Sequence, residues 1–186
     1  MDFISVVQRL VGVPGRARVV AQVRVVVHTT GKASPTTSDN HWSIYLILQG
    51  NADSPQESVR ANMTSDLPHL TGKLVWRSHS FIRPSSALAH WDFETAPVLA
   101  KGISRPIQVN DIAALIYTKG RHKYIMSGGG SGCRFWVLTI LRDLAQNNYI
   151  SLPENGLKDI EDCLQYQYHT DREPRKINWI EGTFLE

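Results

Sequence analysis

The chain has 186 residues, of which 42% are hydrophobic, and it carries a formal net charge of +3. This length and this hydrophobic content are sufficient for one well-buried core, so we expect a single domain over residues 1–186. Lysine and arginine are scattered among acidic residues and form no block, so the pattern does not indicate a nucleic-acid-binding protein.

The two cysteines, Cys133 and Cys163, stand 30 positions apart. They fit no zinc-ligand spacing and make a weak disulfide framework, which is typical of a reducing compartment. The apolar segment Met1–Val13 is interrupted by polar residues and lacks the marks of a signal peptide. No stretch approaches the roughly 18–20 apolar residues of a membrane span. We therefore expect a cytoplasmic protein, and the sequence does not indicate its oligomeric state.

The chain divides into an N-terminal helix and turn over residues 1–16, an α+β core over 17–150, and a C-terminal helix with an extended tail over 151–186. The first helix is expected at Asp2–Leu10 and ends at a glycine-proline turn. β-branched and aromatic residues then predict strands. The expected strands are Ala17–Thr30, His41–Gln49, Ser58–Thr64 and Lys73–Ile82, the second and third forming a hairpin and the fourth exposed or at an edge.

The segment Pro84–Pro106 contains three prolines and shows no clear period, which predicts a long connection with a helical turn around residues 85–90. A helix capped by Asn110 and stopped by Gly120 follows. The remaining expected elements are that helix at Asp111–Lys119, a short strand at Arg121–Met126, a helix at Cys133–Asn147 and a last helix at Leu157–Tyr166.

Cys133 lies where a glycine-rich loop, residues 127–132, runs into the predicted helix. A thiol in the first turn of a helix feels the positive end of the helix dipole, which lowers its pKa and favours the nucleophilic thiolate. Backbone N–H groups of that turn and of the Gly128–Gly132 loop could hold an oxyanion. A cysteine that merely packs as a small apolar residue is the alternative.

His41 begins a predicted strand upstream of Cys133, where its imidazole could take the thiol proton and return it to a leaving group. Asn40-His41-Trp42-Ser43-Ile44-Tyr45 resembles the histidine strand of permuted papain-like enzymes, the NlpC/P60 superfamily members similar to H-rev107 and lecithin:retinol acyltransferase. Gly132-Cys133-Arg134-Phe135-Trp136 resembles their cysteine segment. In those proteins too, the histidine strand precedes the cysteine helix.

This resemblance implies a permuted papain-like α+β fold, an antiparallel sheet of four to five strands packed against the cysteine helix, and acyl transfer through a thioester. The stretch Asn40–Asn148 also resembles an uncharacterised domain of fungal proteins, on its Asn-His-Trp, Ser58-Val59-Arg60 and Gly-Cys-Arg-Phe-Trp segments.

The residue that would orient His41 departs from the pattern of these relatives. They place a second histidine about a dozen residues after the first, where this chain has Asp53. If the two strands form an antiparallel hairpin in which the numbers of paired residues add up to an odd number, Asn62 and Asp66 lie on the same face as His41. A register slip of one residue excludes both. Asn62 is our first choice, because an amide can accept from the imidazole N–H as the orienting asparagine of papain-like enzymes does. Asp66 is the alternative.

The candidate substrate-binding residues surround Cys133 and His41. Trp42 and Trp136 could line an acyl pocket, although aromatic residues at such positions more often belong to the core. Tyr45 is expected on the His41 face of its strand, in a cleft or in the core. Gly132 could supply a backbone donor, and Arg134 could bind an anionic group or lie in solvent as a first-turn residue.

The remaining cysteine and histidines do not extend the site. Cys163 is expected to pack in an amphipathic helix, and the other histidines show no metal-ligand spacing, so we predict neither metal nor cofactor. The leading hypothesis is a cysteine-dependent hydrolase or acyltransferase acting on an amide or ester. The alternatives are a non-catalytic domain that binds a small molecule in its cleft, and a cofactor-free cyclase or isomerase of a fungal biosynthetic pathway.

Overall fold

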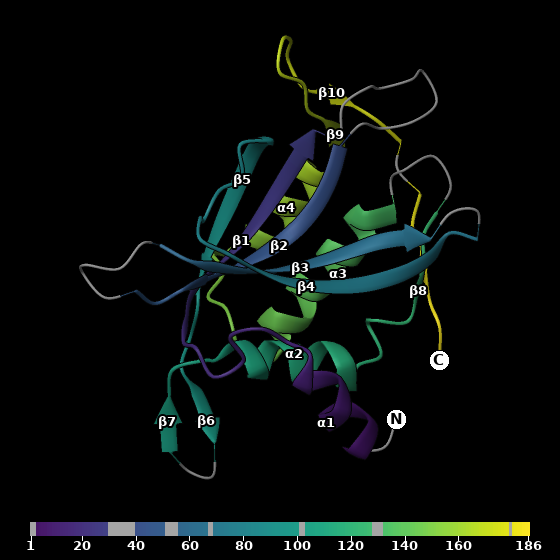
Figure 1. The fold of residues 1–186 in the computed structure, drawn as a ribbon. Coiled ribbons are helices and arrows are strands. Elements are labelled where there is room, and N and C mark those ends of the chain that lie inside the picture. The colour runs from purple at the N-terminus through teal and green to yellow at the C-terminus, as the bar shows by residue number, and fades with distance from the viewer. Residues whose placement is uncertain are drawn as a thin grey trace.

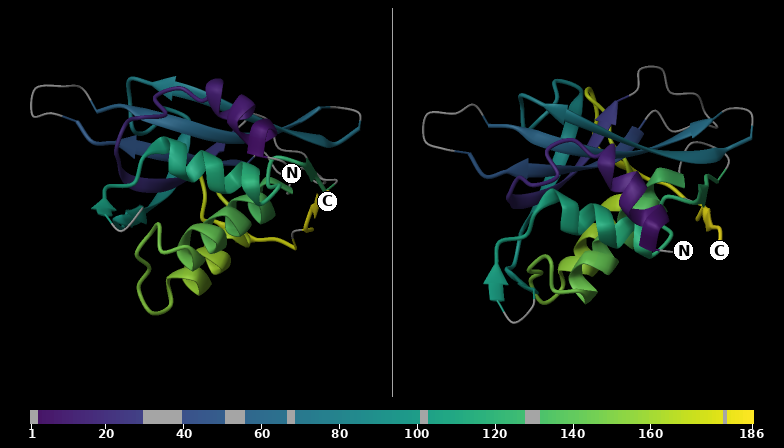
Figure 2. Two further views of the ribbon diagram at one scale, coloured as in Figure 1. Left: turned by 90° about the horizontal axis from the view of Figure 1, so that it is seen from below. Right: turned by 60° about the horizontal axis from the view of Figure 1, so that its bottom comes forward.

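The computed structural model describes residues 3–29, 40–50, 56–66, 69–100, 103–127, 132–178 and 180–186. The chain is α+β, with a large antiparallel sheet and helices α2, α3 and α4 gathered on one side of it (Figures 1 and 2). The helices are α1 (Phe3–Val11), α2 (Val109–Thr118), α3 (Gly132–Gln146) and α4 (Gly156–Leu164). Within the described ranges, no helix is long and apolar enough to cross a membrane.

The main sheet has seven strands in the order β11-β8-β4-β3-β2-β1-β5. They are β1 (Val20–Thr29), β2 (Asn40–Leu48), β3 (Ser58–Asp66), β4 (Thr71–His79), β5 (Ala87–Glu94), β8 (Tyr124–Ile125) and β11 (Thr183–Phe184). Two small antiparallel pairs stand outside it, and these are β6 (Val98–Ala100) with β7 (Ile103–Arg105), and β9 (Tyr166–Gln167) with β10 (Arg175–Lys176).

The two faces of the sheet bury different sets of side chains. The helix face carries the main core, in which Trp42 and Ile44 of β2 are buried together with Trp136 of α3. The outer face, opposite the helices, carries a smaller cluster built on Val26, Tyr45 and Ile47. The segment 80–86, which connects β4 to β5, crosses the outer face and contributes Ile82 to this cluster.

The prediction of a long connection at Pro84–Pro106, with a helical turn near residues 85–90, is wrong. Residues 87–94 form β5, which pairs with β1 and closes one edge of the sheet. Ala89, Trp91 and Phe93 alternate with His90, Asp92 and Glu94, which is the period of a half-buried strand. The prolines border this alternation without interrupting it, and β6 and β7 lie in the part of the segment that follows β5.

Three further expectations need correction. The sheet is wider than the expected four to five strands, because β5, β8 and β11 join its edges. Helix α2 is capped by Gln108 instead of Asn110, and the Gln108 N–H donates to the Asp111 carboxylate at 2.8 Å. β8 covers only two residues of the strand expected at Arg121–Met126. The other predicted helices and strands are present, with ends displaced by at most three residues.

Strands β2 and β3 pair over only four residues, from Ile47–Ser58 to Ile44–Ala61. Both strands continue beyond this point, β2 back to Asn40 and β3 on to Asp66, without pairing further. Figure 1 shows the two strands diverging there, with the beginning of α3 in the opening between them. At this opening β2, β3 and the beginning of α3 lie side by side, although α3 is distant from the two strands in the sequence.

Asn40 joins the start of β2 to the C-terminal part of the chain. Its Nδ2 donates to the Tyr168 carbonyl at 2.9 Å, and its Oδ1 accepts from the Tyr168 N–H at 2.6 Å. Asn40 is buried, so losing the side chain leaves backbone groups without partners.

We expect Asn40→Ala to lower the free energy of unfolding by about 1–3 kcal/mol, because both hydrogen bonds to Tyr168 are lost. Urea unfolding followed by circular dichroism measures the change. Asn147→Ala is the matched control, because exposed Asn147 makes one side-chain hydrogen bond and should change the free energy by less than about 0.5 kcal/mol. Equal losses in the two variants would contradict a special role for Asn40.

Candidate active site

Helix α3 begins at Gly132, and Cys133 is its second residue. The start of α3 packs closely against residues 126 and 127, which requires glycine at position 132. A Cβ at Gly132 would lie 2.7 Å from the Ser127 nitrogen and 3.1 Å from the Met126 Cα. The Tyr124 hydroxyl donates to the Gly132 carbonyl at 2.7 Å and accepts from the Gly182 N–H at 3.1 Å. The first turn of α3 is therefore held against β8 and the C-terminal segment.

The Cys133 thiol lies in the opening between β2 and β3. Cys133 is 3% exposed. Its sulfur is hydrogen-bonded to the His41 imidazole and accepts the backbone N–H of Trp42. His41 also bonds through Nε2 to Oδ1 of Asn62 on β3. We infer that the other ring nitrogen, Nδ1, faces the thiol.

Asn62 is fixed by two donors. Its Oδ1 accepts from His41 Nε2 and from Arg60 Nη2, the latter at 3.1 Å. Because the guanidinium can only donate, the oxygen of the amide, and not its nitrogen, must face this pair. An amide oxygen at Nε2 in turn keeps the proton on that nitrogen and leaves Nδ1 free to exchange a proton with the thiol. This is the arrangement that a nucleophile, a base and an orienting group require.

The electrostatics of the pair favour charge separation. Burial alone would raise the pKa of the Cys133 thiol, but the hydrogen bond to His41, the imidazolium charge and the Arg134 guanidinium outweigh burial and lower this pKa. Burial and the Arg60 charge oppose protonation of His41, yet its bonds to Cys133 and Asn62 raise its pKa. The two shifts have the directions expected for a thiolate–imidazolium pair.

A second polar group lies beside this pair on the outer face. His28 is buried, with Nε2 2.7 Å from Ser43 Oγ and Nδ1 3.2 Å from Ser86 Oγ. Arg60 Nε donates to the same Ser43 oxygen at 3.2 Å. The His28 and His41 ring centroids are 6.2 Å apart. Burial, followed by the charges of Arg60 and His41, lowers the pKa of His28 to about 3, so this imidazole is neutral at pH 7.

The structure brings together Cys133, His41 and Asn62, as the sequence predicted for the pair and for the first choice of orienting residue. Tyr45 pairs with Arg60, so the numbers of paired residues add up to an odd number. This is the register that places Asn62 on the same face as His41. The Asp66 side chain and the Gly128–Ser131 part of the glycine loop lie outside the described residues.

The candidate substrate-binding residues are mostly buried. Trp42 and Trp136 are fully buried on the helix face, and Arg134 is fully buried with its Cζ 5.9 Å from the centre of the Trp42 ring. Tyr45 lies on the His41 face as expected but is 1% exposed, beneath Arg60. These placements assign Trp42, Trp136 and Tyr45 to the two cores, and Arg134 is buried against the Trp42 ring. Gly132 serves the packing of α3.

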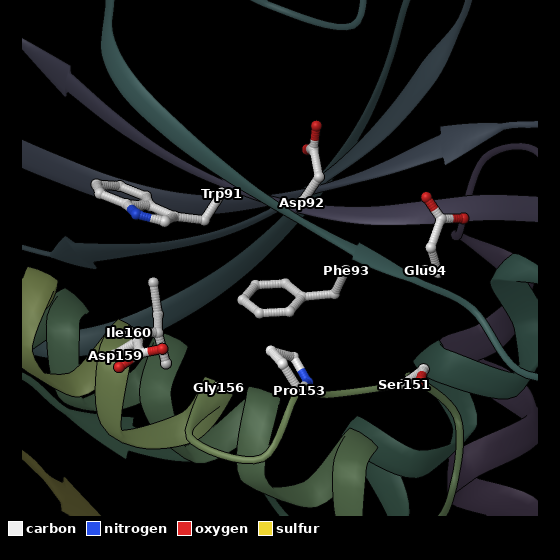
Figure 3. Close-up of a pocket in the computed structure, with 9 residues that line it drawn as sticks. All are labelled: Trp91, Asp92, Phe93, Glu94, Ser151, Pro153, Gly156, Asp159 and Ile160. Atoms are coloured by element: carbon white, nitrogen blue, oxygen red, sulfur yellow. The ribbon is translucent and has the colours of Figure 1, made fainter.

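A cavity of about 390 Å³ lies between β5 and the segment leading into α4, and Figure 3 shows its lining. Phe93 lies between Trp91 and Pro153 in this view, with Ile160 of α4 on the left. None of the nine lining residues belongs to the group around Cys133. The link between the cavity and that group is a ring contact. Trp91, which lines the cavity, stacks on Trp42, the neighbour of His41, with ring centroids 5.4 Å apart.

Sequence reasoning missed Arg60, Ser43 and His28 as neighbours of the candidate triad. Arg60 was visible in the Ser-Val-Arg segment and on the correct face of its strand, but its contacts depend on the register between strands. Cys163 is a free cysteine in α4, as expected from its amphipathic position. In the described part of the chain, no three histidine, cysteine or acidic side chains are grouped to hold a metal ion.

Comparison with protein families gives a match over most of the chain. The sequence profile of a family described as a domain of unknown function, DUF7770, matches residues 23–185. The chain belongs to this family. The match includes β2, β3 and α3, and so all three residues of the candidate triad. Searches of curated proteins and of solved structures found no match.

The low pKa of His28 predicts a stability that depends on pH. Below pH 6.5 the unfolded chain protonates His28, whereas the folded chain does not until about pH 3. The free energy of unfolding should therefore fall by about 1 kcal/mol per pH unit from this residue as the pH drops through that window. Urea unfolding between pH 7 and 4 measures the slope. His28→Gln should flatten it, and the half-buried control His169→Gln should not.

Proposed function

We propose that this protein is a cysteine-dependent hydrolase or acyltransferase in which Cys133 is the nucleophile, His41 the base and Asn62 the orienting residue. The observation that carries this proposal is the position of the His41 ring, which bonds to Cys133 on one side and Asn62 on the other. The three residues come from α3, β2 and β3, and the lowered thiol pKa matches the need for a thiolate.

In the proposed reaction, the Cys133 thiolate attacks the carbonyl carbon of an ester or amide and forms a carbon–sulfur bond. The protonated His41 gives its proton to the departing alcohol or amine, which leaves a thioester on Cys133. His41 then takes a proton from water or from an acceptor molecule, whose oxygen or nitrogen attacks the thioester carbonyl. The carbon–sulfur bond breaks, which releases the acyl product and restores the Cys133 thiolate beside protonated His41. The Cys133 N–H, in the first helical turn, could donate to the oxyanion.

The order of these residues supports a place among permuted papain-like enzymes. The histidine strand precedes the cysteine helix, and an asparagine on the neighbouring strand stands in for the second histidine of the lecithin:retinol acyltransferase type. A non-catalytic binding domain is the second candidate, and the near-complete burial of Cys133 is the observation that favours it.

Alkylation separates the two candidates. We expect limiting iodoacetamide to label Cys133 selectively well below pH 8, because His41 lowers the pKa of its thiol. His41→Ala should abolish this selectivity, and His169→Ala should preserve it. Peptide mass spectrometry measures both sites, and Cys163, whose pKa is raised chiefly by burial, is the internal reference. Slow and equal labelling of both cysteines would argue for the binding domain.

Turnover tests the role of Asn62. With a p-nitrophenyl ester, kcat/KM should rise as the pH passes the lowered pKa of Cys133 and fall as it passes the raised pKa of His41. Asn62→Ala should reduce kcat/KM about 10- to 100-fold, the typical effect of losing a hydrogen bond to a charged group.

Asn62→Asp provides a sharper readout. A carboxylate at Nε2 should raise the pKa of His41 further and move the basic limb of the profile to higher pH. A purely structural role for Asn62 would leave that limb in place. Undiminished turnover in Cys133→Ala would contradict the assignment of the nucleophile.

A further inference from the structure

Two arginines stand side by side on the outer face next to the candidate triad. Arg60 of β3 and Arg77 of β4 are directly opposite one another in the antiparallel register, so their side chains leave the sheet on the same side. Arg60 is partly buried and Arg77 is exposed. Arg60 also touches the triad, through its hydrogen bond to Asn62.

This pair has no counter-charge among the described residues. Several other arginines have a close acidic partner, as in the bidentate Arg24–Asp92 pair at 2.6 and 2.7 Å, whereas no ion pair within the described ranges reaches Arg60 or Arg77. Like charges placed directly opposite destabilise a sheet, and burial of Arg60 adds to this cost. Burial and then the Arg77 charge lower the pKa of Arg60. An anion bound between the two guanidinium groups would offset both penalties.

The Arg60 guanidinium is held in place by hydrogen bonds that use only some of its N–H donors. Nε donates to Ser43 Oγ at 3.2 Å and Nη2 to Asn62 Oδ1 at 3.1 Å, while Cζ lies 5.7 Å from the Tyr45 ring centre. An arginine has five N–H donors, so three are left for another acceptor, since the described residues supply no further one. A fixed planar group with free parallel donors suits a carboxylate.

We propose that Arg60 and Arg77 bind a carboxylate of the substrate, so that Cys133 acts on acyl compounds that carry a second acid group. This inference rests on the proposed function, because it takes Cys133 as the nucleophile. Asn62 and His41 separate the Arg60 guanidinium from the thiol. The carboxylate is therefore a few bonds away from the reacting carbonyl, as in a succinyl or glutaryl group.

The binding experiment uses glutarate as the probe and its neutral analogue glutaramide as the reference, with isothermal titration calorimetry on the full chain. The wild type should bind glutarate in preference to glutaramide. Arg60→Gln and Arg77→Gln should each weaken glutarate binding about tenfold or more, the size of a charge-assisted hydrogen bond. Arg142→Gln, which removes an arginine paired with Glu161 on the surface of α3, is the control and should bind glutarate as the wild type does.

Turnover supplies the second readout, as the ratio of kcat/KM for the p-nitrophenyl esters of glutarate and pentanoate. The ratio should exceed one in the wild type and fall in both arginine variants. Because it compares two acyl groups in the same variant, it cancels any effect of Arg60 on Asn62.

Equal binding of glutarate and glutaramide, equal weakening in the Arg142 control, or tighter binding of inorganic phosphate would each overturn the carboxylate site. Hydrolysis of both esters at one rate would overturn the site and leave the proposed function standing. Arginine-dependent glutarate binding without hydrolysis of either ester would support the site as a ligand site and overturn the proposed function.

Discussion

The end of pairing between β2 and β3 is the constraint on which the rest of the site depends. Past Ile44 and Ala61 the two strands separate, and the start of α3 occupies the opening. The Trp42 N–H can then donate to the Cys133 sulfur. His41 and Asn62 reach across the opening from the two strands. A register shift of one residue would send one of these two side chains to the helix face and dismantle the site.

The three consecutive residues Asn40, His41 and Trp42 serve three different purposes. Asn40 ties the strand to the Tyr168 backbone, and His41 faces the thiol. Trp42 fills the core with its side chain while its N–H holds the sulfur. Alternation along the strand explains the division, since neighbouring residues point to opposite faces. A short motif can therefore be decisive for the site even though only one of its side chains, that of His41, has a role in the proposed chemistry.

Much of the core architecture could be predicted from the sequence because its signals are local. Valine-rich and aromatic runs indicated β1 and β2, and the helical spacing behind Cys133 indicated α3. The edge strand β5 could not be predicted as readily, because prolines lie on both sides of its alternating residues and are typical of a loop.

The candidate site could be predicted only as far as the alternation of side chains along a strand allows. Alternation limited the candidates for the residue that bonds to His41 to a few positions on β3, and Asn62 at one of them makes this bond. The contacts of Arg60 with Ser43 and Asn62 could not be predicted, because they depend on where the strands pair and where they separate. The burial of Arg134 was equally hidden, since its partner on the helix face, the Trp42 ring, is distant in sequence.

The charges around His41 also connect the proposed carboxylate site with the proposed chemistry. Arg60 opposes protonation of His41, and it does so across a single shared acceptor, Asn62. A carboxylate bound at Arg60 would offset that charge and favour the imidazolium form. This is the form that must deliver a proton to the leaving group. Binding of an acidic substrate would thus prepare the acid for the step that follows, and a neutral substrate would not.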